Sequence, residues 1–183
     1  MKLVRAESAP VSADSGLNEI GLLAASLHEN RPNTPTQIQA LETRSAYIQH
    51  LLSYIDINKL KKLKIVAHIG NGCAGLVLKA LMEDLPFEWI LLQEIPDGTF
   101  PNGVPNPLLP ENRSLAAQAV RADQADFGSA WDGDFDRCFF YDEHGNFIEG
   151  YYLVGLFATE LLKNPNKSSD KIVYDPRMTW NTL

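Results

Sequence analysis

The sequence has little cysteine and lacks a long apolar run. Cys73 and Cys138 are its two cysteines among 183 residues, and they are too far apart to form a metal-binding pair. No apolar run approaches the ~18 residues that a membrane-spanning helix needs. Residues 1–7 also lack the apolar core of a signal peptide. We therefore expect no membrane partner and a reducing, cytoplasmic location.

Positive charge is also scarce. Lysine and arginine number 16 against 23 acidic residues, which gives a formal net charge of −7. Such a balance argues against a nucleic-acid surface or an anionic membrane as a partner. Hydrophobic residues make up 45% and charged residues 21%, which is ordinary for a globular protein. The length allows one good core or two small ones.

The most informative stretch is acidic and lies between two apolar segments, residues 127–131 and 138–141. Asp132, Asp134 and Asp136 alternate along it, and Arg137 follows the third aspartate. Apolar runs interrupted by Asp and Gly predict strand, loop, strand. Three carboxylates so close together repel one another, and a hard cation that prefers oxygen ligands removes that cost. An arginine beside such a cation suits a phosphate group.

The remaining pattern predicts an α/β fold, with a mostly parallel sheet covered by helices. Short apolar runs at 64–69 and 88–93 alternate with helical periodicity, as in βαβ units. The acidic loop should then lie at the carboxyl end of a strand, where such sheets bind ligands. The other expected elements are helices at 17–28, 41–54, 111–124 and 150–163 and a last strand at 171–175.

Three further features have competing interpretations. The glycines at 70, 72 and 75 match a dinucleotide-binding turn in spacing, but no suitable acidic ribose ligand follows, and tight strand-to-helix packing explains them equally well. The loop at 96–107 contains four prolines, and a long loop of this kind in a compact domain is often functional. Asp97 within it is interpreted as a turn-forming residue and not as a catalytic one. His68 lies on an apolar strand and reads as a core histidine rather than a ligand.

Several motifs in order resemble the α-D-phosphohexomutase family, the phosphomannomutases and phosphoglucomutases. They are the glycine turn at 70–75, the proline loop at 96–107, Asp-Gly-Asp-Phe-Asp-Arg at 132–137, Glu-Gly-Tyr-Tyr at 149–152 and the segment 175–182. The resemblance implies that Asp132, Asp134 and Asp136 hold Mg²⁺ against a phosphoserine in another domain. It implies that Arg137 contacts the phosphosugar, a mannose or glucose phosphate. Lys2 aligns with a family lysine that is a proton-transfer candidate.

The resemblance also implies that the chain is part of a larger enzyme. The family's serine loop, its sugar-reading loop and its C-terminal phosphate loop have no counterpart in this sequence. We expect residues 1–60 to be the tail of domain I with connecting helices, 61–169 to be the metal-binding domain II, and 170–183 to begin domain III. The remaining domains are then partners, and the chain alone is expected to be inactive. Phe135 and the segment 180–182 favour the mannose type over the glucose type.

Other interpretations of the acidic loop remain open. It could be a solvated turn, or the Asp-x-Asp of an aspartyl-phosphate phosphatase, whose downstream motifs are not found. The three aspartates and Glu143 fall at positions 1, 3, 5 and 12 of a calcium EF-hand, but Arg137 stands where that loop needs glycine and strands replace the helices. A non-catalytic binding module on the same fold is the alternative to the enzyme.

Overall fold

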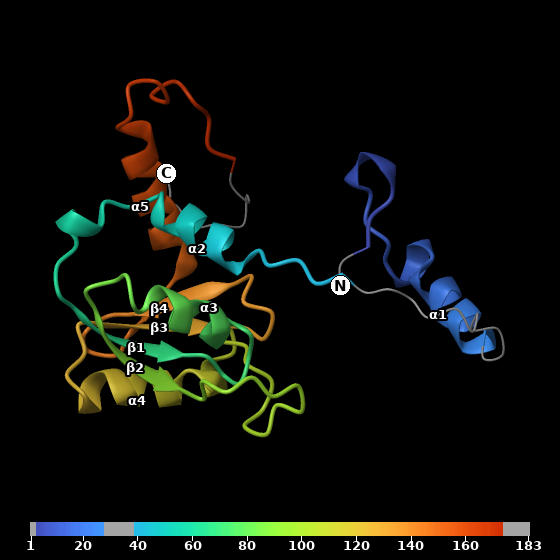
Figure 1. Ribbon diagram of the computed structural model, residues 1–183, viewed down its shortest axis with the longest axis horizontal. Helices are drawn as coiled ribbons and strands as arrows, with labels where there is room; N and C mark the ends of the chain where they lie inside the picture. The colour runs from blue at the N-terminus through green and yellow to red at the C-terminus, as the bar shows by residue number, and fades with distance from the viewer. Residues whose placement is uncertain (1–2, 28–38, 174–183) are drawn as a thin grey trace. The chain divides into compact units, whose positions relative to one another are not determined.

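The computed structural model describes residues 3–27 and 39–173 (Figure 1). Contacts divide the chain into two units, the first ending at Glu42 and the second beginning at Thr43. The first unit holds two short 3-10 turns, η1 (Ala6–Ser8) and η2 (Ala13–Ser15), and the helix α1 (Leu17–Ser26). None of its described residues is buried, so the hydrophobic core of the described chain lies in the second unit.

The second unit is built on one five-stranded sheet in the order β2-β1-β3-β4-β5. Its strands are β1 (Lys64–His68), β2 (Glu88–Leu92), β3 (Phe127–Trp131), β4 (Cys138–Tyr141) and β5 (Phe147–Ile148). Strands β1, β2 and β3 are parallel, whereas β4 and β5 are added antiparallel. The predicted α/β fold is therefore confirmed. A hairpin adds β4 because the six residues after β3 are too few for a parallel crossover.

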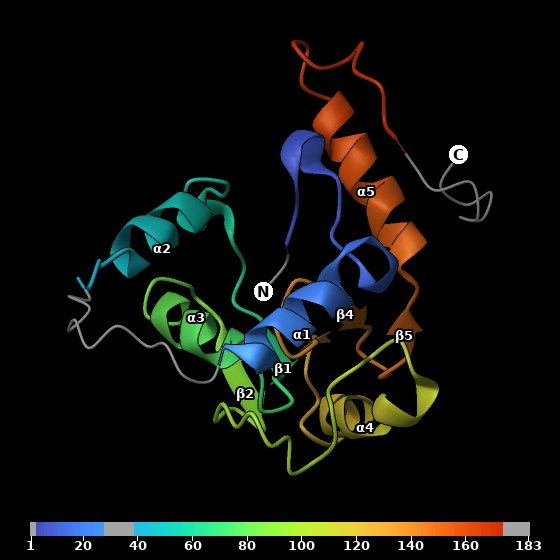
Figure 2. The ribbon, with the colours of Figure 1, turned by 90° about the vertical axis from the view of Figure 1, so that its right-hand side faces the viewer.

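Helices cover both faces of this sheet. Figures 1 and 2 show α3 (Ala74–Leu81) and α4 (Ser114–Ala122) on opposite sides of the parallel strands. The chain runs from β1 through α3 to β2, and then back through α4 to β3 on the other side of β1. The strand order therefore reverses between β1 and β3, which is where open α/β sheets form a ligand-binding crevice.

Strand β1 lies at the centre of the core. Val66 and Ala67 are fully buried and point to opposite faces, as successive residues of a strand do. Val66 packs with Val120 of α4, and Ala67 packs with Leu78 of α3. Burial on both faces explains why β1 reads as a continuous apolar run instead of an alternating one.

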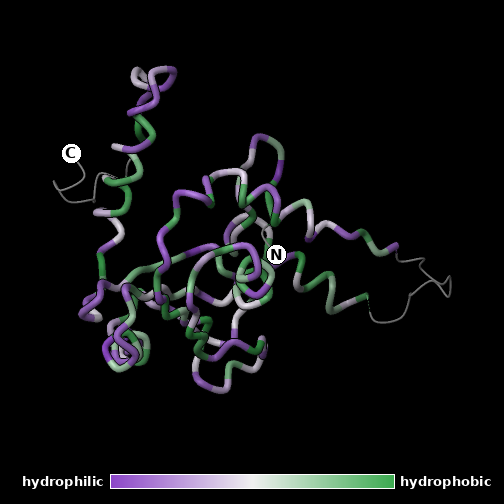
Figure 3. Tube along the Cα trace, turned by 60° about the vertical axis from the view of Figure 1, so that its left-hand side comes forward, coloured by the Kyte–Doolittle hydropathy of each residue, from purple (hydrophilic) through white to green (hydrophobic). Residues whose placement is uncertain are grey.

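The remaining helices are α2 (Arg44–Leu52) and α5 (Gly150–Leu162), with short turns η3 (Ile57–Lys59) and η4 (Pro110–Asn112). The predicted helices are all present, each one to three residues shorter at one or both ends. α5 has no buried residue, and Figure 3 shows hydrophobic stretches along its length. No helix among the described residues is long and apolar enough to cross a membrane.

The expected strand at 171–175 is wrong over the part that the structure describes. Residues 171–173 have no strand conformation, and the rest of the predicted strand at 171–175 lies outside the described residues. An apolar β-branched run forms a strand only where a neighbouring strand satisfies its backbone groups, and no described strand pairs with this one.

Candidate metal site

The acidic loop, residues 132–137, joins β3 to β4 at the carboxyl end of β3, as predicted. Its shape depends on Phe135, which has a left-handed backbone (φ 48°) and packs against the core cluster between the sheet and α3. The Phe135 amide donates to the Asp132 carbonyl at 3.1 Å. A left-handed phenylalanine costs about 1–3 kcal/mol, which the packing of its ring offsets.

The three aspartates converge. Each offers a carboxylate oxygen, and these oxygens all lie within 4.8 Å of one another. Asp132 is buried at 1% exposure, whereas Asp134 and Asp136 are exposed. Opposite ligands of a Mg²⁺ ion lie about 4.2 Å apart, and those of Ca²⁺ about 5 Å. Three carboxylate oxygens gathered this closely can converge on one hard divalent cation, so the donor set fits such an ion.

Arg137 acts as the internal counter-ion of this loop. Its Nε atom donates to Oδ2 of Asp132 at 2.7 Å, and its backbone amide donates to Oδ1 at 3.0 Å. Its Nη2 atom forms an ion pair with the same Oδ2 at 2.6 Å. The guanidinium side chain remains 47% exposed. Within the described residues Nη1 has no hydrogen-bond partner, so this atom remains able to bind a phosphate oxygen.

The charges of the loop match a dication. Three aspartates and one arginine give residues 132–137 a formal charge of −2. The guanidinium neutralises the buried Asp132, and the carboxylates of Asp134 and Asp136 face solvent. A divalent ion would bring the loop to neutrality, whereas a phosphate alone would add to its negative charge. The arrangement therefore favours binding a cation first and an anion only beside it.

The EF-hand interpretation is wrong. Glu143, which that interpretation places at the last ligand position, lies in the turn between β4 and β5 and pairs with His144. It is not one of the acidic residues whose oxygens converge. Strands flank the loop on both sides, and an EF-hand needs helices there.

Two other residues singled out in the sequence have structural roles. Asp97 accepts hydrogen bonds from the amide and hydroxyl of Thr99 at 2.9 and 2.7 Å, which lower the pKa of its exposed carboxyl. His68 ends β1 at 8% exposure, and its Nε2 bonds to Oε1 of Gln93 at 2.9 Å. Burial lowers the pKa of His68, and the bond to Gln93 offsets only part of that effect. Lys2 lies outside the described residues.

A cavity of about 140 Å³ lies next to the acidic loop but is not lined by it. Its walls include His68 and Gln93, residues of the proline loop, and Ser114 and Leu115 at the start of α4. The sequence marked Gln93 only as the end of a strand, whereas its left-handed backbone (φ 50°) turns the chain out of β2. Glutamine does not signal such a turn, because a left-handed backbone is usually marked by glycine or asparagine.

The fold and the acidic loop together define the class of protein. It is an α/β/α domain with a candidate cation-binding loop at the point where the strand order of the sheet reverses. The family model for phosphoglucomutase/phosphomannomutase, alpha/beta/alpha domain II, matches residues 45–145. That match covers more than half of the chain. The chain therefore belongs to the phosphoglucomutase/phosphomannomutase family, and the resemblance seen in the sequence is confirmed.

Individual relatives agree with this assignment. A protein of Xanthomonas campestris pv. campestris described as phosphohexose mutases is 53% identical over 185 residues, which cover all of this chain and 40% of the relative. A phosphomannomutase of Salmonella montevideo is 49% identical over 190 residues, covering all of this chain and 41% of that protein. The chain thus spans about 40% of the length of these curated relatives.

A solved structure shows the same fold. The crystal structure of a phosphoglucomutase/phosphomannomutase family protein from Burkholderia thailandensis superposes with a TM-score of 0.65 at 30% identity. The superposition covers 80% of this chain and 32% of that protein. The described sheet and its helices are therefore one region of a larger architecture in that protein.

Proposed function

We propose that this chain is the metal-binding portion of a phosphomannomutase, which interconverts mannose 6-phosphate and mannose 1-phosphate. The observation that carries the proposal is the convergence of Asp132, Asp134 and Asp136 at the reversal point of the sheet, in a loop of net charge −2. The relatives named phosphomannomutase support the reaction class. A phosphoglucomutase of the same family, or a non-catalytic module on this fold, is the alternative.

The chain's own residues have distinct tasks in this proposal. The three aspartates hold Mg²⁺, and the ion when bound neutralises charge on a phosphoryl group. Asp132 offers its ligand from a buried position, and Arg137 is its counter-ion when no metal ion is bound. Nη1 of Arg137 and the exposed edge of its guanidinium donate to a phosphate of the phosphosugar. The phosphoserine and the sugar-reading groups come from the remaining domains.

The proposed domain arrangement follows from the same resemblance. Residues 1–60 are the tail of domain I with its connecting helices, 61–169 are domain II, and 170–183 begin domain III. Helix α2 packs with the sheet unit, since the contact boundary falls between Glu42 and Thr43. Lys2 stays a proton-transfer candidate on the resemblance alone. Without a phosphoserine, the chain by itself should not turn over mannose 1-phosphate.

A titration of the melting temperature with Mg²⁺ tests the metal site. An ion at 100 times its dissociation constant stabilises the folded chain by about 2.7 kcal/mol, which raises the melting temperature by roughly 5–10 °C for a protein of this size. Asp134→Asn should abolish most of that shift because it removes one of three charged ligands. A parallel titration with the larger ion Ca²⁺ gives a second melting-temperature shift, and comparing the two shifts shows which ion the loop prefers.

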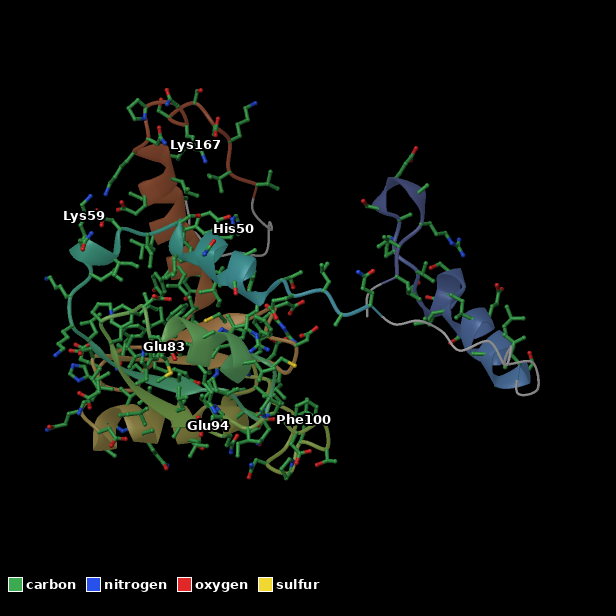
Figure 4. All side chains as sticks on the ribbon, in the orientation of Figure 1. His50, Lys59, Glu83, Glu94, Phe100 and Lys167 are labelled. Carbon is green, nitrogen blue, oxygen red and sulfur yellow. The ribbon has the colours of Figure 1, made fainter. Side chains whose placement is uncertain are left out.

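The matched control is Glu83→Gln, which also removes one negative charge. Glu83 is an exposed residue just after α3 (Figure 4), outside the acidic loop. Its metal-dependent shift should equal that of the unaltered chain. No shift in any of the proteins, or equal shifts in all of them, would contradict a specific site on the acidic loop.

A further inference from the structure

Three loops meet where the strand order reverses. The glycine turn (residues 70–75) follows β1 and leads into α3, the proline loop (residues 96–107) follows β2, and the acidic loop follows β3. Because the three strands are parallel, their carboxyl ends lie on one edge of the sheet. Of these loops, only the acidic loop carries the candidate metal ligands. Both of the other loops contact it at Gly133.

The glycine turn contacts the backbone of the acidic loop. The Cys73 amide donates to the Gly133 carbonyl at 3.0 Å. A Cβ atom added at Gly72 would lie 2.8 Å from the Gly133 carbonyl oxygen and 3.2 Å from that of Asp132. Both obstacles are backbone atoms that cannot rotate away. Gly72 is therefore required for space, so that the turn can approach the acidic loop closely enough to donate its hydrogen bond.

The proline loop contacts Gly133 from its Cα side. A Cβ atom added at Gly133 would lie 3.1 Å from Cζ of Phe100 and 3.8 Å from Cγ of Pro105. Phe100, labelled in Figure 4, has a left-handed backbone (φ 49°). Such a conformation costs about 1–3 kcal/mol in a non-glycine residue and persists only where its surroundings impose it. The ring of Phe100 is thus held at the acidic loop at an energetic cost.

The glycine turn and the proline loop are also tied to each other. The Asp97 amide donates to the Asn71 carbonyl at 2.9 Å, and Asn102 donates to Oδ1 of Asn71 at 2.9 Å. Pro105 packs so closely on Gly70 that a Cβ there would lie 2.5 Å from the proline Cβ. The two loops therefore form one rigid clamp around Gly133, the residue between Asp132 and Asp134.

We infer that Gly72 and Phe100 are positioning residues for the metal site: they fix Gly133, and through it the two aspartates on either side. The inference rests on the proposed function of the acidic loop. The Gly133 carbonyl belongs to the peptide bond with Asp134, and Asp132 directly precedes Gly133, so a displaced Gly133 shifts the backbone that carries both carboxylates. Mg²⁺ demands near-ideal octahedral geometry, so a small displacement weakens binding.

The test compares Mn²⁺ affinities of the full 183-residue chain, measured from the electron paramagnetic resonance signal of free Mn²⁺. Gly72→Ala forces the acidic loop away, and Phe100→Ala removes the ring that faces Gly133. Each is expected to weaken Mn²⁺ binding by roughly 10- to 100-fold, the range seen when groups that orient metal ligands are removed. Gly72→Ala should also speed hydrogen exchange of the Cys73 amide, because its acceptor moves.

Two controls separate positioning from general destabilisation. Gly98→Ala lies in the proline loop with nothing near its Cβ position, and it should bind Mn²⁺ normally. Val120→Ala removes buried volume on the opposite face of the sheet, so it lowers the melting temperature and leaves Mn²⁺ affinity unchanged. If Gly72→Ala does not fold, Phe100→Ala still decides the matter.

The outcomes are distinct. Normal Mn²⁺ affinity in Phe100→Ala and Gly72→Ala, with binding intact in the unaltered chain, overturns the positioning role and leaves the metal site standing. Equal losses in Val120→Ala and the two clamp variants also overturn it, since stability alone would then set the affinity. An unaltered chain that binds no Mn²⁺ overturns the proposed function and the positioning role together.

Discussion

Arg137 offers the most direct test of how the acidic loop handles charge. Its guanidinium makes one hydrogen bond and one close ion pair to the carboxylate of Asp132, a residue that is 1% exposed. Arg137→Ala removes both interactions and retains the backbone amide bond to Oδ1. Leaving a buried charged acceptor partly unsatisfied costs about 1–3 kcal/mol, and the lower part of that range applies because the arginine side chain is half exposed.

The same substitution should strengthen metal binding. A guanidinium and a divalent cation that share one carboxylate lie roughly 5 Å apart, and at the dielectric constant of water their repulsion is about 1–2 kcal/mol. Removing the guanidinium relieves this repulsion and lets the metal act as counter-ion of Asp132. We therefore expect the metal-free variant to melt at a lower temperature and Mg²⁺ to raise that temperature more than it does in the unaltered chain.

Thermal unfolding with and without Mg²⁺, at low ionic strength, measures both effects. Lys62→Ala is the control, since it removes one exposed positive charge outside the acidic loop. It should change neither the metal-free stability nor the metal-dependent shift appreciably. A smaller shift with Mg²⁺ in Arg137→Ala than in the unaltered chain would refute the reasoning. Arg137 would then be needed to present Asp132 to the ion, and would not compete with the ion for it.

Two further predictions concern buried polar groups on the sheet. The hydroxyl of Tyr141 is buried without a hydrogen-bond partner among the described residues, and burial raises its pKa to about 12. Tyr141→Phe should therefore stabilise the folded chain by about 1 kcal/mol, which raises the melting temperature by a few degrees. A lower melting temperature would mean that the hydroxyl has a hydrogen-bond partner. Because burial lowers the pKa of His68 below its ordinary 6.5, the unfolded chain binds the extra proton. Stability should fall as pH decreases from about 6.5 towards the folded pKa, and denaturant unfolding at several pH values should show this fall flattened in His68→Gln.

The fold was predictable because its pattern is local. The apolar strand β1, the glycine turn and the helix α3 follow one another directly along the chain. The acidic loop directly follows β3. Proximity of these loops then follows from the parallel order of the strands. The acidic triad was visible in the sequence because its three aspartates alternate within five residues.

The inner structure of the site was not predictable in the same way. That Arg137 faces Asp132 depends on the left-handed turn at Phe135, and phenylalanine carries no signal for that conformation. Phe100 reaches Gly133 only through the path of a proline-rich loop. The strand expected at 171–175 was predicted from β propensity alone. Residues 171–173 form no strand in the part that the structure describes, because propensity without a pairing partner is not sufficient.

The hairpin that carries the aspartates also has a consequence for the order of folding. Trp131 pairs with Cys138 across a six-residue loop, whereas the parallel pairing of Ile65 with Phe127 closes a far longer stretch of chain. Hairpins form in about 1–10 μs, and pairings distant in sequence form more slowly. The ligand loop is therefore expected to exist before the clamp around it. Under the proposed function, a nascent chain would bind a cation weakly at first and then more tightly as the parallel strands assemble, so the ion would favour completion of the sheet.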